Sequence, residues 1–218
     1  MVGIAALALL PACADSGDGN EDGAGTEAAS DAGTAGSGSG AAEGEPTAGV
    51  DLCEGVAETN VVWAINGNLV PPMELAPSEL GIEVARSWIG EQGTAELAFE
   101  IMCDGPVYFW GLVWDADVSE AENPDSYYIH VDGGAEATWN YGCSNGPGEG
   151  GSWNWITVDA WREDCDQQRL ELVLEAGMHT VVIRNREAGT GANVAALAGL
   201  VFSHDPDIDP TVYTPTPE

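Results

Sequence analysis

The chain has 218 residues, 44% of them hydrophobic, and carries 37 acidic but only five basic side chains, which gives a formal net charge of −32 at pH 7. Such a charge repels the phosphate backbone, so the composition excludes nucleic acid as a natural ligand. All five bases are arginines.

The first residues resemble a bacterial lipoprotein signal peptide. An apolar run from Ile4 to Leu10 is followed by Pro11-Ala12-Cys13, with the small Ala12 at the cleavage position. The run has the length of a signal h-region and is far shorter than the ~20 residues that span a bilayer. We therefore expect residues 1–12 to be removed and Cys13 to carry lipid, which anchors the protein to a bacterial outer membrane or cell surface. Met1-Val2-Gly3 lacks the usual positive charge, which is compatible with a start upstream of Met1.

A tether is predicted next. Residues 14–50 consist almost wholly of Gly, Ala, Ser, Thr, Asp and Glu, with eight acids and no aromatic residue. This composition cannot bury enough apolar surface to offset the entropy of ordering, so residues 13–50 are expected to be a disordered acidic leash on the order of 35 Å in mean reach. The rest of the chain, residues 51–218, keeps 29 acids and all five arginines, a net charge of −24.

Four cysteines remain for the predicted domain, which spans residues 51–206 and is followed by an extended, proline-rich tail at 207–218. An even number of cysteines in an exported chain favours two disulfides, and three connectivities are possible. We favour Cys53 with Cys103 and Cys143 with Cys165, the second pair bracketing a glycine-rich loop. A four-thiolate zinc site is the alternative, but the paired C-x-x-C spacing of such sites is absent.

Short strands dominate the domain. The strand patterns centre on Leu97, Phe99 and Ile101, on Pro106–Trp114, on Tyr127, Ile129 and Val131, on Trp153–Val158, on Leu170, Leu172 and Leu174, on Val181 and Ile183, and on Leu197–Phe202. Turn residues separate them, as in Asp132-Gly133-Gly134, and only Glu79–Trp88 has a weak helical period. Many short strands with little helix predict an all-β fold, an antiparallel two-sheet β-sandwich of jelly-roll type.

An ordered series of motifs carries a family resemblance. The motifs are Asp125–Gly134 (DSYYIHVDGG), Thr138-Trp139-Asn140, Trp153-Asn154-Trp155, Gly177–Val181 (GMHTV), Arg186-Glu187 and Ser203–Pro206 (SHDP). Together they resemble the second half of the galactose-binding-like jelly-roll modules, a group that includes carbohydrate-binding modules appended to bacterial glycoside hydrolases. The resemblance covers residues 107–206 and implies a jelly-roll sandwich that binds a glycan.

Calcium is the one cofactor that the resemblance raises. Members of the group often hold a structural calcium ion near an early glutamate and an aspartate shortly before the last strand. Glu74 matches the first position, but Ala198 or Asn193 stands where the aspartate would fall, so we expect no cofactor and regard a structural calcium ion as doubtful. The acidic stretches 115–125 and 205–209 also lack the spaced acids and central glycine of an EF-hand.

The tryptophans suggest a sugar site by a separate route. Eight of them lie between Trp63 and Trp161, and an indole offers a flat apolar face that suits a sugar ring, with amide and carboxylate groups to meet the hydroxyls. The predicted ligand-binding residues are Trp139, Asn140, Trp153, Asn154, Trp155, Trp161 and Tyr128. Because tryptophan in a sandwich is often core, Trp63, Trp88, Trp110 and Trp114 are expected to be packing residues. Trp153 and Trp155 share one strand face. Arg186-Glu187 is either a polar pair lining the site or an ion pair closing a loop.

Three functions follow from these patterns. The first is a monomeric, surface-anchored lipoprotein whose non-catalytic β-sandwich module binds a glycan or polysaccharide and meets the membrane through its lipid alone. The second is a structural or adhesion lipoprotein that uses the same fold to bind a protein or envelope partner. The third, a small glycosidase, needs a placed pair of carboxylates, and none stands out in so acidic a chain.

Overall fold

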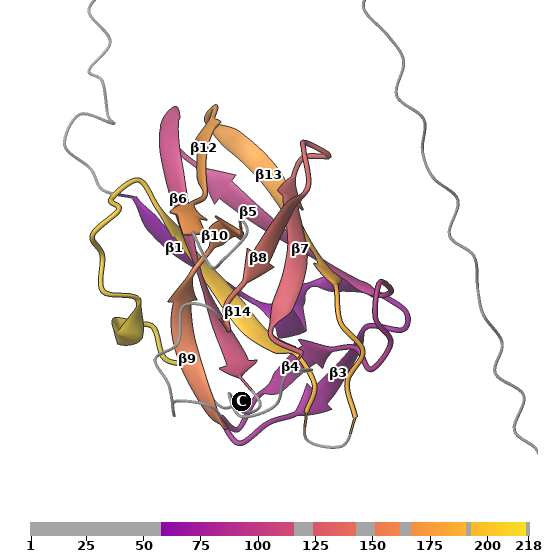
Figure 1. The fold of residues 1–218 in the computed structure, drawn as a ribbon. Helices are drawn as coiled ribbons and strands as arrows, with labels where there is room; N and C mark the ends of the chain where they lie inside the picture. The colour runs from indigo at the N-terminus through magenta and orange to yellow at the C-terminus, as the bar shows by residue number, and fades with distance from the viewer. Residues whose placement is uncertain (1–57, 116–123, 143–150, 162–166, 191–192, 217–218) are drawn as a thin grey trace, which may run out of the picture. The chain divides into compact units, whose positions relative to one another are not determined.

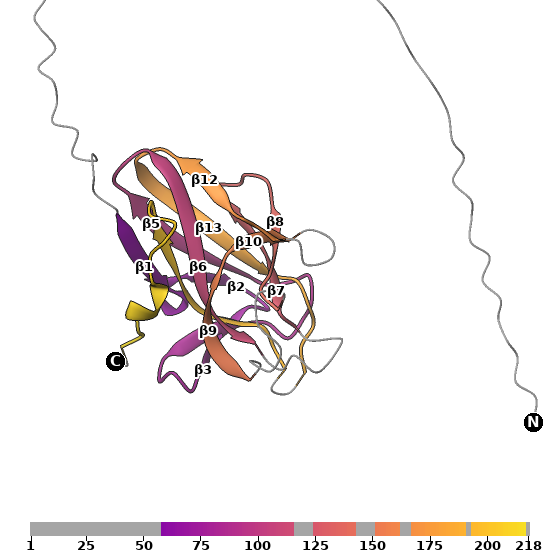
Figure 2. The same ribbon diagram turned by 60° about the vertical axis from the view of Figure 1, so that its left-hand side comes forward.

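The structure is a computed structural model that describes residues 58–115, 124–142, 151–161, 167–190 and 193–216. Two antiparallel sheets pack face to face within this part of the chain, which confirms the predicted antiparallel β-sandwich (Figures 1 and 2). None of the helices among the described residues has the length and apolarity that crossing a bilayer requires.

The larger sheet has seven strands. They are β1 (Thr59–Trp63), β3 (Glu74–Pro77), β4 (Glu83–Arg86), β6 (Gly105–Asp115), β9 (Ser152–Thr157), β12 (Glu171–Leu174) and β14 (Ala196–Ser203). The strand order is β12-β6-β14-β4-β3, with β9 also paired to β6 and β1 also paired to β14. The long strands β6 and β14 therefore form the centre of this sheet.

The smaller sheet has five strands in the order β2-β5-β13-β7-β8. They are β2 (Asn68–Val70), β5 (Thr94–Ile101), β7 (Ser126–Val131), β8 (Ala137–Asn140) and β13 (Gly177–Asn185). A separate two-stranded ladder joins β10 (Asp159–Trp161) to β11 (Gln167–Arg169), and two 3-10 turns, η1 (Ala64–Asn66) and η3 (Pro210–Val212), complete the elements.

The core lies between the two sheets and follows the alternation of the strands. Successive side chains point to opposite faces, so every second residue of β5, β6, β7, β13 and β14 reaches the interior. The largest fully buried side chains of this core include Leu97, Phe109, Tyr127, Ile183 and Phe202. The alternation predicted for these strands therefore places their apolar side chains in the core.

One predicted element is wrong. The weak helical period of Glu79–Trp88 gives strand β4 instead, which pairs with β3 on one side and with β14 on the other. Ladder hydrogen bonds and the burial of Val84 and Ala85 on opposite faces outweigh a weak local helical preference.

Cys103 is disulfide-bonded and nearly buried at the end of β5. The partner predicted for it, Cys53, lies outside the described residues, as do Cys143, Cys165 and the whole of the predicted signal peptide and tether, so these predictions stay open. The tail is described to residue 216 and contains η3, whose first turn is capped by the Asp209 side chain.

Candidate functional site

The outer face of the seven-stranded sheet collects five tryptophans. They are Trp63 on β1, Trp110 and Trp114 on β6, and Trp153 and Trp155 on β9. Alternation explains their direction, because Phe109 and Val113 of β6 face the core, so Trp110 and Trp114, which each follow one of them, face outward. Trp110 is buried under this surface, whereas the other four are half-buried.

Strand register aligns the first row of side chains across the face. Trp153 pairs with Trp114, Trp114 with Ala196, Ala196 with Arg86, and Arg86 with Glu74. The row therefore crosses β9, β6, β14, β4 and β3 in turn. The centroids of Trp114 and Trp153 lie 5.7 Å apart with their planes tilted by 55°, so two indoles form one end of the row and a charged pair forms the other.

A second row runs beside the first. Trp155 pairs with Leu112, Leu112 with Gly199, and Gly199 with Trp63. The two indoles lean toward each other over the middle of the row, with centroids 6.2 Å apart. A Cβ atom at Gly199 would lie 2.6 Å from Cε3 of Trp63, so glycine at this position leaves room for that ring.

A pocket of about 340 Å³ opens over the first row. Its lining includes Trp114, Trp153, Ala196 and Arg86 from the sheet and Glu79 from the β3–β4 connection. The hollow arises because Ala196 is the only small side chain in the row, between the large Trp114 and Arg86. Apolar walls with a few charged groups at one end are typical of small-molecule sites.

Arg86 closes the polar end of this pocket. One terminal nitrogen, Nη2, donates to Glu74 Oε1 at 3.5 Å, and the guanidinium lies over the Trp88 ring, 4.9 Å from its centroid. Its Nε is buried and has no hydrogen-bond partner among the described residues. Arg86 thus brings a positive charge to one end of the pocket, while its Nε lies beneath the accessible surface.

No family model and no curated protein matches this sequence. Solved structures do. An exo-β-1,3-galactanase from Phanerochaete chrysosporium is 16% identical over 67% of this chain, with a TM-score of 0.45, and this chain spans 30% of that enzyme. A β-(1,4)-mannanase of Podospora anserina described as GH26-CBM35 is 11% identical over 70% of this chain and 30% of its own, with a TM-score of 0.48. A family 35 carbohydrate-binding module from Clostridium thermocellum is 18% identical over 66% of this chain and 98% of its own, with a TM-score of 0.38. At these identities the likeness concerns the fold.

The predicted site residues do not form one site. Trp153 and Trp155 do share an outward face, as their spacing predicts, but Asn154 between them points to the opposite side of β9 and donates to Ser152 Oγ at 2.9 Å. Asn140 lies in the other sheet, paired with Ser126. The side chain of Trp161 lies outside the described residues.

Trp139 is a correction to the predicted binding set. It is fully buried, its indole N–H donates to the Thr157 carbonyl at 3.0 Å, and its ring packs against both Tyr127 and Tyr141. The ring also covers Gly111 of β6, where any side chain would overlap it. Trp139 therefore bridges the two sheets inside the core and presents no face to a ligand.

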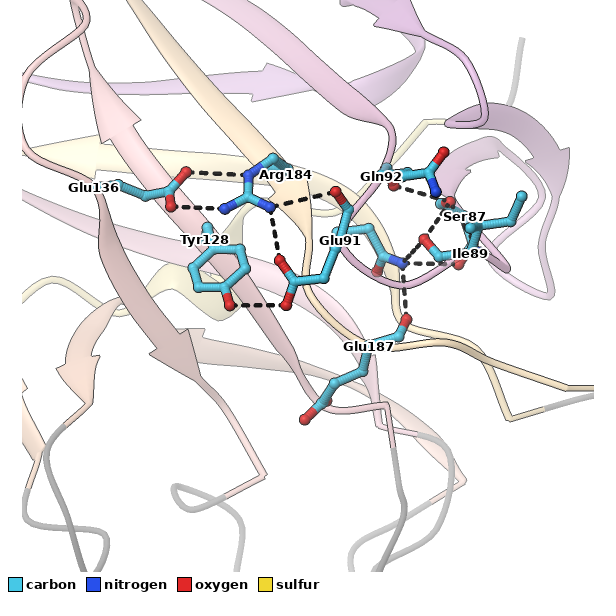
Figure 3. Close-up of polar contacts among 9 residues, drawn as sticks. Ser87, Ile89, Glu91, Gln92, Tyr128, Glu136, Arg184 and Glu187 are labelled. Carbon is cyan, nitrogen blue, oxygen red and sulfur yellow. Dashed lines mark hydrogen bonds and ion pairs between the residues drawn. The ribbon is translucent and has the colours of Figure 1, made fainter. Parts of the chain in front are cut away.

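Tyr128 is engaged on the outer face of the smaller sheet, as Figure 3 shows. Its hydroxyl donates to Glu91 Oε1 at 3.0 Å, and the Arg184 guanidinium lies 4.0 Å from its ring centroid. Arg184 itself is fully paired, with Nε and Nη2 on the Glu136 carboxylate and Nη1 on Glu91. Tyr128 therefore belongs to a closed polar network on the face opposite to the tryptophans.

A second group of acids surrounds the start of β7. Burial, together with the negative charges of Glu187 and Asp115, raises the pKa of Asp125 to about 7. Arg186 pairs with Glu187 at 2.9 Å and donates to Ser126 Oγ, while Glu187 accepts the backbone N–H of Asp125. Arg186 and Glu187 thus form an ion pair, as one of the two alternatives that the sequence left open predicts, and both contact the start of β7.

No group of three or more metal-binding side chains occurs among the described residues. Glu74, the residue matched to a calcium ligand, hydrogen-bonds to Arg86 instead. Sequence reasoning missed Arg86, Ala196 and the outward role of Trp63 and Trp114. The alternation of Trp110, Leu112 and Trp114 could have indicated a shared face, but only the register brings Arg86 onto it.

Proposed function

We propose that the outer face of the seven-stranded sheet binds a carbohydrate chain. The observation that supports this most directly is the pair of rows in which Trp153 and Trp114, and Trp155 and Trp63, lie side by side next to a pocket of about 340 Å³. Indole faces pack well against the apolar C–H faces of sugar rings, and a charged group at one end of a mostly apolar site orients the ligand.

The proposed module is non-catalytic and works at a bacterial surface. Binding on an open sheet face needs no acid–base pair, and a lipid on Cys13 with a leash at residues 14–50 would display the module away from the membrane. A protein or envelope partner is the alternative ligand for the same face, since half-buried tryptophans also serve in protein interfaces.

The test is a binding screen of the full chain, with disulfides intact, against a glycan array and insoluble polysaccharides. We expect binding that Trp153→Ala and Trp114→Ala each weaken by about tenfold or more while the variants keep their thermal midpoint near that of the wild type. Tyr128→Ala is the matched control, because it removes an aromatic ring from the outer face of the other sheet.

Three results would each contradict a part of the proposal. Loss of binding in Tyr128→Ala but not in Trp153→Ala would place the site on the five-stranded sheet. A folded wild-type protein that binds no glycan would favour the protein-partner alternative, and release of new reducing ends from a bound polysaccharide would contradict the non-catalytic role.

A further inference from the structure

Resting on the proposed function, we infer that the hollow over Ala196 is a preformed subsite for one unit of a single glycan chain. One wall of the hollow is the indole pair, Trp114 and Trp153, and the opposite wall is the β3–β4 connection, residues 78–82. The ligand class is therefore a separate chain, as in a soluble or amorphous polysaccharide, and not the flat face of a crystalline one.

The order of the strands sets the two walls. The indole pair comes from β9 and β6 on one side of β14, whereas β4 and β3 lie on the other side. Ala196 of β14 pairs with Trp114 and with Arg86, and its methyl group leaves the space between the walls open. Because walls and floor belong to strands of one sheet, hydrogen-bonded ladders fix the width of the hollow.

The β3–β4 connection is held in place by its own hydrogen bonds and by the sheet. The Oγ–H and the backbone N–H of Ser78 both donate to the Ile82 carbonyl, at 2.7 and 3.1 Å. Leu80 and Ile82 pack against the same apolar cluster of the outer face that the indole pair contacts. The wall is thus formed before a ligand binds, and a preorganised site loses less conformational entropy on binding.

The orientation of the indoles suits a single chain and not a flat surface. The ring planes of the indole pair are inclined by 55°, so only one of the two rings can lie parallel to a flat ligand surface. Trp63 and Trp155 repeat this feature with an inclination of 52°. A crystalline face would therefore stack on one ring of each pair at most. A single chain can turn from unit to unit and enter the hollow, where it contacts both rings of the indole pair.

Glu79 supplies the polar contact of this subsite. Its side chain is exposed on the β3–β4 connection and lines the hollow on the side opposite to the indole pair. Sugar hydroxyls can donate to a carboxylate, and a hydrogen bond to an ionised acceptor is stronger than one between neutral groups. A sugar unit in the hollow can thus pack an apolar face on an indole while its hydroxyls reach Glu79.

The experiment compares chains of the same glycan in two physical states. The full chain, with its disulfides intact, is titrated with cellohexaose, chitohexaose and mannohexaose, and its adsorption to crystalline cellulose, α-chitin and crystalline mannan is measured. We expect the wild type to bind at least one hexaose about tenfold or more tightly than the crystalline form of the same glycan.

Two substitutions test the subsite itself. Ala196→Leu fills the hollow but keeps the indole pair, and should weaken binding of the best hexaose by about tenfold or more. Glu79→Ala removes the acceptor and should weaken it by about threefold or more. The matched controls are Ala98→Leu, on the outer face of β5, and Glu83→Ala, an exposed acid at the start of β4 that does not line the hollow. Both controls should leave the affinity unchanged.

The outcomes separate this subsite from the proposed function. Unchanged affinity in Ala196→Leu and Glu79→Ala, with loss in Trp153→Ala, would overturn the subsite and leave the sheet-face site intact. Equal or tighter binding of the crystalline forms would overturn the ligand class. A folded wild type that binds none of the six probes would overturn both, and a negative glycan array as well would contradict the proposed function. A weakened variant counts only if its near-UV circular dichroism matches the wild type, and Glu79→Ala decides if Ala196→Leu does not fold.

Discussion

Trp139 is a core residue, unlike the half-buried tryptophans on the outer face of the seven-stranded sheet. Because its indole N–H satisfies the Thr157 carbonyl and its ring covers Gly111, Trp139→Phe leaves a buried carbonyl without its donor and a small cavity. We expect the free energy of unfolding to fall by about 1–3 kcal/mol, as measured by urea denaturation. Trp153→Phe at the half-buried rim is the control and should change stability much less. A Trp139→Phe protein that is as stable as the wild type would contradict the bridging role.

The contacts of the His179 ring predict how the free energy of unfolding depends on pH near neutrality. Its Nδ1 lies 2.6 Å from Asp132 Oδ2 and its Nε2 lies 2.7 Å from the Glu175 carbonyl oxygen, so acceptors face both ring nitrogens and the doubly protonated ring fits best. Burial lowers the pKa of His179, but these two contacts outweigh it and leave the pKa raised above 6.5. The stabilisation is therefore complete below pH 6.5 and is lost as pH rises through the folded-state pKa.

The measurement is urea unfolding of the wild type and His179→Gln between pH 5.5 and 8.5. The advantage of the wild type over the variant should shrink as pH rises through this range, since the ring loses one of its two protons and one contact. Asp132 remains ionised there, because the contacts with His179 and Thr180 overcome burial and lower its pKa. An advantage that stays constant with pH would show that folding does not raise the pKa of the His179 ring.

At the scale of an element, the start of β7 carries a second pH response of the same sign as that of His179. The pKa of Asp125 is raised to about 7 by burial and by the charges of Glu187 and Asp115, so the folded state favours its protonated form. Its contribution to stability is present below pH 3.8 and is lost as pH rises through about 7. Asp125→Asn, an uncharged mimic of the protonated acid, should therefore gain more stability over the wild type at pH 8 than at pH 5. Thermal unfolding at the two pH values checks this, and an equal shift at both would contradict it.

The elements differ in how far the sequence predicts them. Leu97, Phe99 and Ile101 alternate over an eight-residue strand, which gives a clear period of two and the correct buried face. Trp139 sits in β8, only four residues long, where one tryptophan gives no alternation to say which way it points. The register of Arg86 with Ala196 joins residues 110 positions apart, and such pairing depends on the whole topology rather than on a local pattern. The tryptophan face was therefore predictable in part, and its charged end was not.

At the scale of the whole molecule, charge and anchorage act on the same ligand in different ways. The net charge of −24 in residues 51–218 repels anionic glycans, and Arg86 offsets this repulsion only locally. The sheet-face site is therefore expected to favour neutral glycans. Such a preference should weaken with added salt, since screening acts over about 8–10 Å at 0.1–0.15 M ionic strength.

The proposed lipid on Cys13 and the proposed sugar site make separable predictions for the whole chain. Each buried CH2 of an acyl chain contributes about 0.8 kcal/mol to membrane binding, so a lipidated Cys13 should hold the wild type in the membrane fraction of an expressing bacterium. Cys13→Ala should appear in the soluble fraction and bind glycans with unchanged affinity, because the residues of the two tryptophan rows lie between positions 63 and 199 and include none of the signal region. Intact mass of the membrane-extracted protein checks the lipid directly. A Cys13→Ala protein that remains on the membrane would contradict anchorage through this cysteine, and a loss of glycan affinity in the soluble variant would contradict the independence of the two sites.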